Sequence, residues 1–207
     1  MMIENFLVDF DGVIFDSLHI KGLAFAEVLQ DRYPKNYCDK IYQYHMNNGG
    51  INRKDKFIFF YKNIAKENVK LSQIEKDLDK FSKIMSQRLF DTNLLIDDSI
   101  NFIRENQELN FHIISSAESN ELDKLANFLD ISFLFKSING SIDDKCKKSL
   151  ELIEEHSITR NNCLFIGDSV QDKQAADCAE VLFLGYNNMS LEDCHLIKSF
   201  NEILSIC

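Results

Sequence analysis

The chain has 207 residues, 45% of them hydrophobic, which is long enough for one large domain or a domain with a smaller insert. Its net charge of −10 argues against a nucleic-acid partner, although a small anionic substrate can still bind beside a cation. No apolar run is long enough to span a bilayer, and Met1–Val8 is too short and too acidic for a secretory leader. We therefore expect a cytoplasmic protein with no membrane or nucleic-acid partner.

The six cysteines are scattered and have no paired C-x-x-C spacing. This pattern favours reduced thiols, most of them in the core, over disulfides or zinc ligands. The cysteines are Cys38, Cys146, Cys163, Cys178, Cys194 and Cys207.

The apolar run from Ile3 to Val8 predicts a buried strand, and the carboxylates Asp9 and Asp11 follow it directly. The carboxyl ends of strands are where ligands bind in open α/β sheets. Two carboxylates this close repel each other unless a cation binds or one of them is protonated. The pattern predicts a metal-assisted carboxylate site, and the alternative is a polar turn made by Asp11 and Gly12.

From about Leu18 to Leu89 the apolar spacing is helical, and no strand is evident. The four expected helices cover residues 20–29, 37–45, 56–65 and 74–89. A loop rich in asparagine and glycine, Asn47–Gly50, separates the second helix from the third. We interpret residues 17–89 as an inserted helical subdomain.

Beyond about Leu95 strands and helices alternate, which predicts a parallel sheet with helices on both faces. The expected strands are 111–115, 133–135, 163–167 and 181–184, and the expected helices are 97–106, 118–129, 143–156 and 171–179. The strand at 3–8 belongs to the same sheet. The predicted fold class is therefore α/β, with a core of residues 1–16 and 90–207.

Two further strand ends carry polar residues. Ser115 and Ser116 lie between a strand and a helix, where hydroxyls and free N–H groups can hold a phosphate, unless one serine simply caps the helix. Lys145 lies near a helix start, which the helix dipole disfavours, so we expect an anionic partner there. Lys147 and Lys148 compete for this role, and a solvated lysine is the alternative.

After the strand at 163–167, Asp168 and Asp172 add two acids beside a glycine turn. Magnesium prefers a few hard oxygen ligands, with room left for water and a substrate phosphate. Asp9, Asp168 and the backbone carbonyl of Asp11 fit that requirement. The alternative for Asp172 is an acid that merely favours a helix N-terminus.

In this order the motifs resemble those of the haloacid dehalogenase (HAD) superfamily of aspartyl-phosphate-forming phosphotransferases. Asp9-Phe-Asp11-Gly12-Val matches DxDGx(V/T), Ser115 matches the second motif and Lys145 the third. The run from Gly167 to Asp172 matches GDSxxD. The resemblance is to subfamily I, which includes phosphoglycolate phosphatase and β-phosphoglucomutase. It implies a Rossmann-like parallel-sheet core with an inserted all-helical C1 cap.

The resemblance also implies roles for the residues. Asp9 is the expected nucleophile, and Asp11 the acid that protonates the leaving group and later deprotonates water. Ser115 and Lys145 are expected to bind the phosphoryl oxygens. The other residues expected at the phosphoryl group are Ser116 and Gly12.

The implied cofactor is Mg²⁺, held by Asp9, Asp11 and Asp168. Asp172 is either a further ligand or the group that orients Lys145. The sequence leaves both roles open.

The cap is expected to close over the site and to exclude water. Its loop at 49–55 resembles the specificity loop of β-phosphoglucomutase-like members, which makes Arg53 a candidate ligand for a distal anionic group. The alternative for Arg53 is a solvated position at a helix start.

Related activities differ by few residues. A haloacid dehalogenase lacks the second acid of the first motif, which is present here. A phosphonatase needs a cap lysine for a Schiff base, and although Arg53 cannot serve, Lys54 and Lys56 keep this activity open. A β-phosphoglucomutase usually has a histidine where this chain has Lys21, with His19 two residues earlier.

The expected function is that of a Mg²⁺-dependent phosphatase acting on a small phosphorylated metabolite, similar to phosphoglycolate or a sugar phosphate. A sugar phosphomutase is the first alternative. A catalytically inactive regulatory protein on this scaffold is the second, but it predicts loss of Asp9, Asp11 or Asp168, and all three are present. We expect a monomer or a homodimer.

Overall fold

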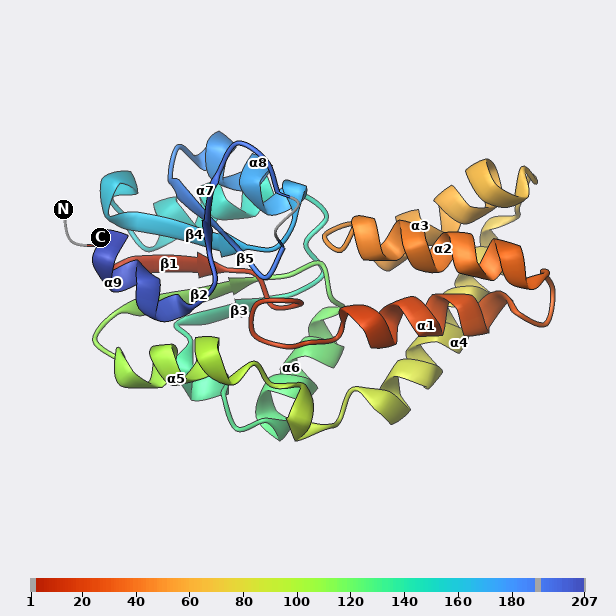
Figure 1. Ribbon diagram of the computed structural model, residues 1–207, viewed down its shortest axis with the longest axis horizontal. Coiled ribbons are helices and arrows are strands. Elements are labelled where there is room, and N and C mark those ends of the chain that lie inside the picture. Colours follow the sequence, from red (N-terminus) through yellow and green to blue (C-terminus); the bar gives the residue numbers. More distant parts are fainter. Residues whose placement is uncertain (1–2, 189–190, 207) are drawn as a thin grey trace.

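The strand that precedes the two carboxylates, β1 (Asn5–Val8), lies inside a parallel sheet of order β3-β2-β1-β4-β5-β6 (Figure 1). The computed structural model describes residues 3–188 and 191–206, and six strands lie in those ranges. The other strands are β2 (Asn110–Ile114), β3 (Ser137–Asn139), β4 (Cys163–Gly167), β5 (Leu182–Tyr186) and β6 (His195–Ile197). Val8 pairs with Ile113 of β2 and Ile166 of β4, so β1 has a neighbour on each side. The predicted α/β parallel sheet is confirmed.

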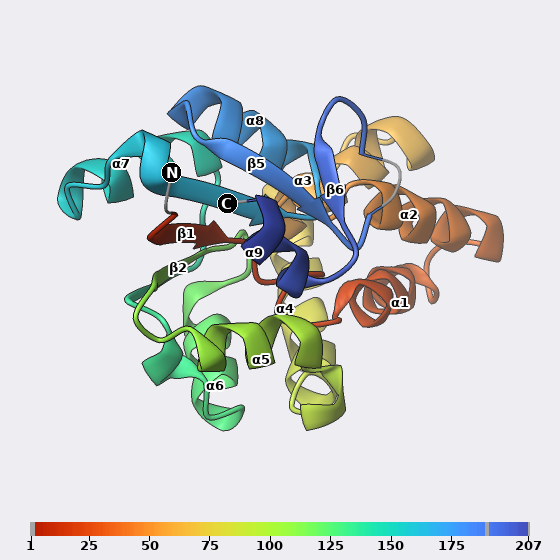
Figure 2. The ribbon, with the colours of Figure 1, turned by 60° about the vertical axis from the view of Figure 1, so that its left-hand side comes forward.

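Helices cover both faces of the sheet, with α7 and α8 on one face and α5 and α6 on the other (Figure 2). These helices are α5 (Asp97–Glu105), α6 (Ser119–Phe128), α7 (Lys145–Glu155) and α8 (Val170–Ala179), and a short α9 (Ile203–Ile206) lies near the C-terminus. The central strands are apolar on both faces because both are covered, which explains why their sequences read as continuous apolar runs. Phe6 and Val8 pack in one core cluster, and Leu7 between them packs in the other.

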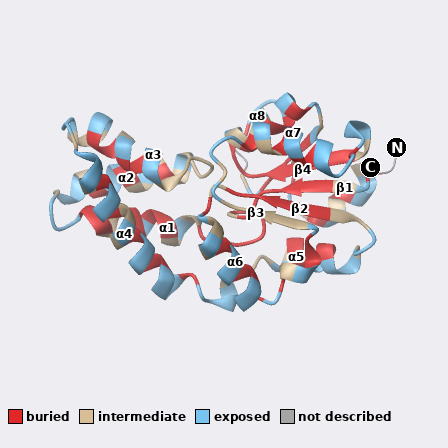
Figure 3. Cartoon of the chain, turned by 180° about the vertical axis from the view of Figure 1, so that it is seen from behind, coloured by how far each residue is buried: buried red, intermediate tan, exposed pale blue. Residues whose placement is uncertain are grey.

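Four helices lie together beyond the carboxyl ends of the strands (Figure 1). They are α1 (Leu18–Leu29), α2 (Lys35–Asn47), α3 (Arg53–Phe59), which continues as a π-helical turn (Phe60–Ala65), and α4 (Leu71–Arg88). We call residues 18–88 the helical bundle. Its centre is aromatic, with the ring of Phe25 4.5 Å from that of Phe81 and 5.1 Å from that of Phe57. Figure 3 shows buried residues in the bundle as well as in the sheet.

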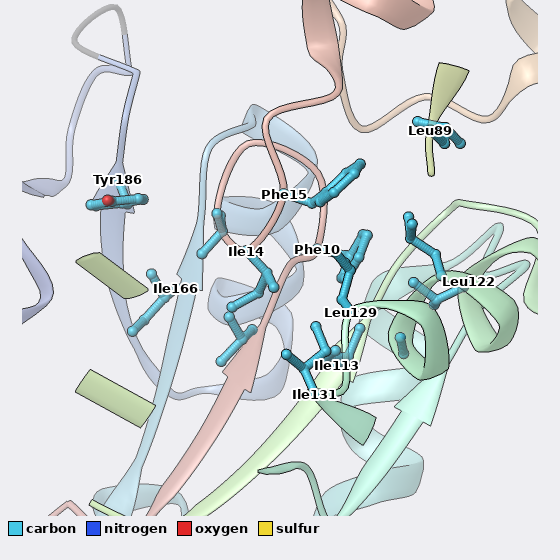
Figure 4. Close-up of a cluster of buried hydrophobic side chains, with 14 of the residues drawn as sticks. Phe10, Ile14, Phe15, Leu89, Ile113, Leu122, Leu129, Ile131, Ile166 and Tyr186 are labelled. Carbon is cyan, nitrogen blue, oxygen red and sulfur yellow. The ribbon is translucent and has the colours of Figure 1, made fainter. Parts of the chain in front are cut away.

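The two chain segments that connect the bundle to the sheet lie side by side. The backbone N–H of Asp16 donates to the carbonyl of Leu94 at 2.7 Å, and Phe15 forms an antiparallel bridge with Leu95. Phe10 and Phe15 stack with their ring centroids 5.6 Å apart, and both lie in the apolar cluster that Figure 4 shows where the chain leaves β1. This packing fixes the chain segment that follows Asp11 and leads into the helical bundle.

Two details of the predicted fold are wrong. Residues 133–135 were expected to form a strand, but Ser132–Leu134 is a 3-10 turn and the strand begins at Ser137. The error has a local cause, because an apolar run this short does not distinguish a buried turn from a strand. The strand His195–Ile197 was not expected, since only three residues pair there.

The expectation that all cysteines are reduced is also wrong. Cys146 of α7 and Cys178 of α8 are joined by a disulfide, with their Cα atoms 5.8 Å apart. Their separation of 32 residues gives no motif, because the pairing depends on the packing of α7 against α8. Cys38, Cys163 and Cys194 are free thiols, and Cys207 lies outside the described residues.

Candidate active site

Asp9 and Asp11 lie on the turn that follows β1. The backbone N–H of Asp9 still donates to the carbonyl of Ile166 in β4. This bond holds Asp9 at the carboxyl end of the strand, where the residue is 3% exposed. Gly12 then has a φ of +82°, and a Cβ atom on it would lie 2.1 Å from Oδ2 of Asp168. Glycine is required at this position both for its conformation and for the close approach of Asp168.

Lys145 lies between two buried carboxylates. It is the first residue of α7, and its Nζ lies 2.9 Å from Oδ1 of Asp9 and 2.6 Å from Oδ1 of Asp172. Lys147 and Lys148 instead approach Glu151 on the outside of the same helix. The predicted anionic partner of Lys145 is therefore confirmed.

Asp172 is fully buried and makes contacts with both of its oxygens. Oδ1 accepts from Lys145, and Oδ2 accepts from the backbone N–H of Ser169 at 3.0 Å and from its hydroxyl at 2.5 Å. Ser169 in turn caps α8, which completes a capping box. Gly167 leaves room for this arrangement, since a Cβ there would lie 2.3 Å from the Cβ of Asp172.

Three carboxylates converge on one point. One oxygen each of Asp9, Asp168 and Asp172 can be chosen so that all lie within 4.8 Å of one another. Burial and, after it, the charge of Asp172 raise the pKa of Asp9 to about 7 against the opposing effect of Lys145. Burial and the neighbouring carboxylates also raise the pKa of Asp168 well above its ordinary value. A hard divalent cation suits this cluster of oxygens, because its charge would offset the repulsion among the carboxylates.

Asp11 has a different environment from Asp9. Its Oδ1 accepts from Nζ of Lys21 and from the hydroxyl of Ser17, both at 2.5 Å. Burial raises the pKa of Asp11, but Lys21 and Ser17 together outweigh burial and leave it below the ordinary value of 3.8. The two carboxylates of the first motif are thus driven in opposite directions, as expected of groups with unequal roles.

Ser115 and Ser116 lie at the end of β2, beside β1. Ser115 is fully buried, and its Oγ accepts from the N–H of Ala117 at 3.1 Å. The Oγ of Ser116 lies 2.9 Å from the carbonyl of Ile142 and 3.1 Å from that of Gly50. Since Gly50 belongs to the helical bundle, Ser116 joins the bundle to the sheet.

A pocket lies between the helical bundle and the sheet edge. It is lined by Asp11, Lys21, Arg53, Lys56, Phe81 and Ser116, among others. Arg53 does not point into solvent, because its Nη2 lies 2.7 Å from Oε1 of Glu121 on α6. Lys54 is exposed, whereas Lys56 is 2% exposed and faces the pocket.

Several residues at this site were not expected from the sequence. Ser17 and Lys21 hold Asp11, and Glu121 holds Arg53. After β5, Asn187 donates to the carbonyl of Gly12, and Asn188 donates to that of Asp168. These two asparagines could have been predicted from the run Tyr186-Asn187-Asn188, which places polar side chains after a further apolar run.

Paired acids after β1, a serine after β2, a lysine on α7 and acids after β4 therefore lie together at the carboxyl ends of one parallel sheet. The model of the haloacid dehalogenase-like hydrolase family matches residues 6–186, and the chain belongs to that family. A comparison with curated protein sequences finds no significant match.

Solved structures share the fold at low sequence identity. A predicted phosphoglycolate phosphatase from Haemophilus somnus 129pt superposes with a TM-score of 0.81 at 16% identity, covering 100% of this chain and 98% of that one. A β-phosphoglucomutase from Clostridium difficile has a TM-score of 0.78 at 16% identity, covering 99% and 96%. The HAD-hydrolase YfnB from Bacillus subtilis, bound to magnesium, has a TM-score of 0.74 at 17% identity, covering 100% and 99%.

Proposed function

We propose that this hydrolase is a Mg²⁺-dependent phosphatase that cleaves a small organic phosphomonoester through an aspartyl phosphate on Asp9. The observation that carries the proposal is the position of Lys145, which lies 2.9 Å from Asp9 and 2.6 Å from Asp172. A buried ammonium beside a buried carboxylate provides both an oriented nucleophile and a positive group for phosphoryl oxygens.

Asp9 is suited to attack because one of its oxygens is already engaged. Oδ1 accepts from Lys145 and from the N–H of Phe10 at 2.8 Å, which leaves Oδ2 for the phosphorus atom. As the new bond between Oδ2 and phosphorus forms, the ester P–O bond breaks and Asp11 gives its proton to the leaving oxygen. Water then attacks phosphorus and releases Asp9, and Asp11 takes the proton from that water.

The phosphoryl oxygens would be bound by Ser115, Ser116, Lys145 and the backbone at Gly12. Lys145 supplies positive charge, and the serines lie at the adjacent strand end. Asp11 must be protonated for the first step, so its contacts with Lys21 and Ser17 have to loosen when substrate enters.

Magnesium would be held by the side chains of Asp9 and Asp168 and by the backbone carbonyl of Asp11. When bound, it supplies positive charge that offsets the charge of the transferring phosphoryl group. Asp172 is better suited to orient Lys145 than to bind the ion, because both of its oxygens accept hydrogen bonds within the protein.

We further propose that residues 17–89 act as a cap over a core of residues 1–16 and 90–207. Support comes from the hydrogen-bonded pair of connections at Asp16 and Leu94, which is suited to a hinge. The description of the magnesium-bound Bacillus subtilis protein refers to interdomain movement in that molecule. Arg53 would release Glu121 and bind a distal anionic group of the substrate in its place.

No helix within the described residues is long and apolar enough to span a membrane. A cytoplasmic location, a phosphorylated metabolite as ligand and a monomer or homodimer are part of the proposal.

The experiment is hydrolysis of a chromogenic phosphomonoester and of a panel of phosphorylated metabolites, with and without Mg²⁺, using Asp9→Asn as the control. We expect phosphate release that requires both Mg²⁺ and Asp9. Conversion of one sugar phosphate isomer into another, without net phosphate release, would favour the mutase. Equal inactivity of both forms across the panel would favour the inactive scaffold.

A further inference from the structure

Three cationic side chains, Lys21, Arg53 and Lys56, line the pocket between the helical bundle and the sheet. Lys21 is paired with Asp11, and Arg53 with Glu121. Within residues 3–188 and 191–206, no carboxylate lies within ion-pair distance of Lys56. A buried cation without a counter-ion is costly, and this one lies at the wall of a pocket.

The hydrogen bonds of Lys56 show what it can still bind. Its Nζ lies 2.9 Å from Nδ1 of His45 and 2.9 Å from the carbonyl of Gly49. The other ring nitrogen of His45 lies 3.0 Å from the carbonyl of Leu18, which only accepts, so that nitrogen carries the proton and Nδ1 is an acceptor. An ammonium has three donors, and these two neutral acceptors use two of them.

The surroundings of Lys56 match this picture. Its Nζ lies 5.8 Å from the ring centre of Phe25, so its stem is packed among apolar groups. Burial and, after it, the charge of Lys21 lower the pKa of Lys56 to about 7, against the opposing effect of Asp11, Asp168 and Asp9. The charged form of Lys56 is therefore poorly stabilised until an anion enters the pocket.

We propose that Lys56 is a specificity-determining residue that binds a second anionic group of the substrate, a carboxylate, on the part of the molecule that leaves with the ester oxygen. This inference rests on the proposed phosphatase function and narrows its substrate class to small phosphorylated acids. The carboxylate supplies the counter-ion that Lys56 lacks, and Asp11, the proposed acid for the leaving oxygen, lines the same pocket.

The test compares two nearly isosteric substrates, phosphoglycolate and phosphoglycolamide, which differ in carrying a carboxylate or a neutral amide. In Lys56→Met we expect KM for the acid to rise about tenfold to a hundredfold, as for a lost charged hydrogen bond, and KM for the amide to change less than about threefold. Lys54→Met, an exposed lysine two residues earlier, is the matched control and should change neither. An equal rise for both substrates would overturn the proposal, because it would assign Lys56 a structural role only.

Wild-type protein provides a second readout that does not depend on how the variant folds. The preference for the acid over the amide, taken as the ratio of their kcat/KM values, should fall as pH rises and Lys56 loses its proton. The carboxylate raises the phosphate pKa of the acid above that of the amide, so the phosphate titration of each substrate is measured separately and its effect removed from the ratio. A preference that is absent, or that does not change with pH, would overturn the proposal. Release of phosphate from neither substrate nor any other ester would instead count against the proposed function itself.

A third measurement separates this role from the imine chemistry of a phosphonatase. The protein is treated with borohydride in the presence of phosphonoacetaldehyde and digested for mass spectrometry. We expect no adduct on Lys56, and a reduced adduct there would overturn its assignment as an anion-binding group.

Discussion

The ammonium of Lys21 lies 2.5 Å from Oδ1 of Asp11, which links the first helix of the bundle to the proposed acid of the first motif. Both side chains are largely buried, at 11% and 22% exposure. The contact holds Asp11 in its ionised form, whereas protonation of a leaving group needs the acid. Movement of Lys21 with the bundle would therefore couple closure of the site to the protonation state of Asp11.

Lys21→Met should raise the pKa of Asp11, because burial then acts without the opposing charge. The first chemical step needs protonated Asp11, so we expect the descending limb of kcat/KM against pH to move to higher pH. A pH profile of Lys21→Met and of Lys35→Met, an exposed lysine of α2, measures this. Superimposable profiles would show that Lys21 does not control Asp11.

The same contact has a consequence for stability. The pKa of Asp11 is lowered in the folded protein. Its ion pair with Lys21 therefore stabilises the fold fully at pH values above 3.8, the ordinary pKa of an aspartate. That contribution is lost as pH falls through the lowered pKa. Urea unfolding at neutral pH and at about pH 3 should show that Lys21→Met loses less stability on acidification than wild type. An equal loss in both proteins would contradict a stabilising ion pair.

Asp172→Asn should separate orientation of Lys145 from metal binding. The amide cannot replace all the bonds that the carboxylate makes to Ser169 and Lys145, so we expect lower kcat and a loss of about 1 kcal/mol from the capping box. Calorimetric titration with Mg²⁺ should give a near-normal Kd for this variant, and little binding for Asp168→Asn. Loss of Mg²⁺ binding in both variants would make Asp172 a ligand.

Glu121→Gln should free Arg53 from its ion pair. If Arg53 exchanges Glu121 for a substrate anion, the variant has one competitor fewer, and KM for an anionic substrate should fall several-fold. Both side chains are largely buried, at 16% and 14% exposure, so leaving Arg53 without its partner should cost about 3 kcal/mol of stability. Arg53→Ala and the double variant complete a cycle. A fall in KM that persists without Arg53 would remove Arg53 from the binding site.

The sequence predicts those site residues that directly follow a strand. Asp9, Ser115 and Asp168 each follow an apolar run, and parallel pairing aligns those ends. Lys145 and Asp172 meet across two helices, and here only the resemblance to a family indicated the pairing. The positions of strand ends and the order of the motifs therefore predicted most of the site residues.

The sequence did not predict contacts between segments that lie far apart in the chain. Lys56 and His45 lie on different helices of the bundle, and Glu121 of α6 contacts Arg53 of α3. Single charged residues at ordinary helical positions do not reveal such partners in a sequence. The Cys146–Cys178 disulfide was missed for the same reason, because helix packing and not spacing brings the two residues together.

The central claim is that Asp9 forms a covalent phosphoryl intermediate, and the most direct test is to trap it. The protein is mixed with a turned-over phosphomonoester and Mg²⁺, quenched in acid and reduced with borohydride, which converts an aspartyl phosphate into homoserine. Peptide mass spectrometry should find homoserine at position 9 in wild type and none in Asp9→Asn. Normal turnover with no homoserine at position 9, or with the modification at another aspartate, would contradict the account.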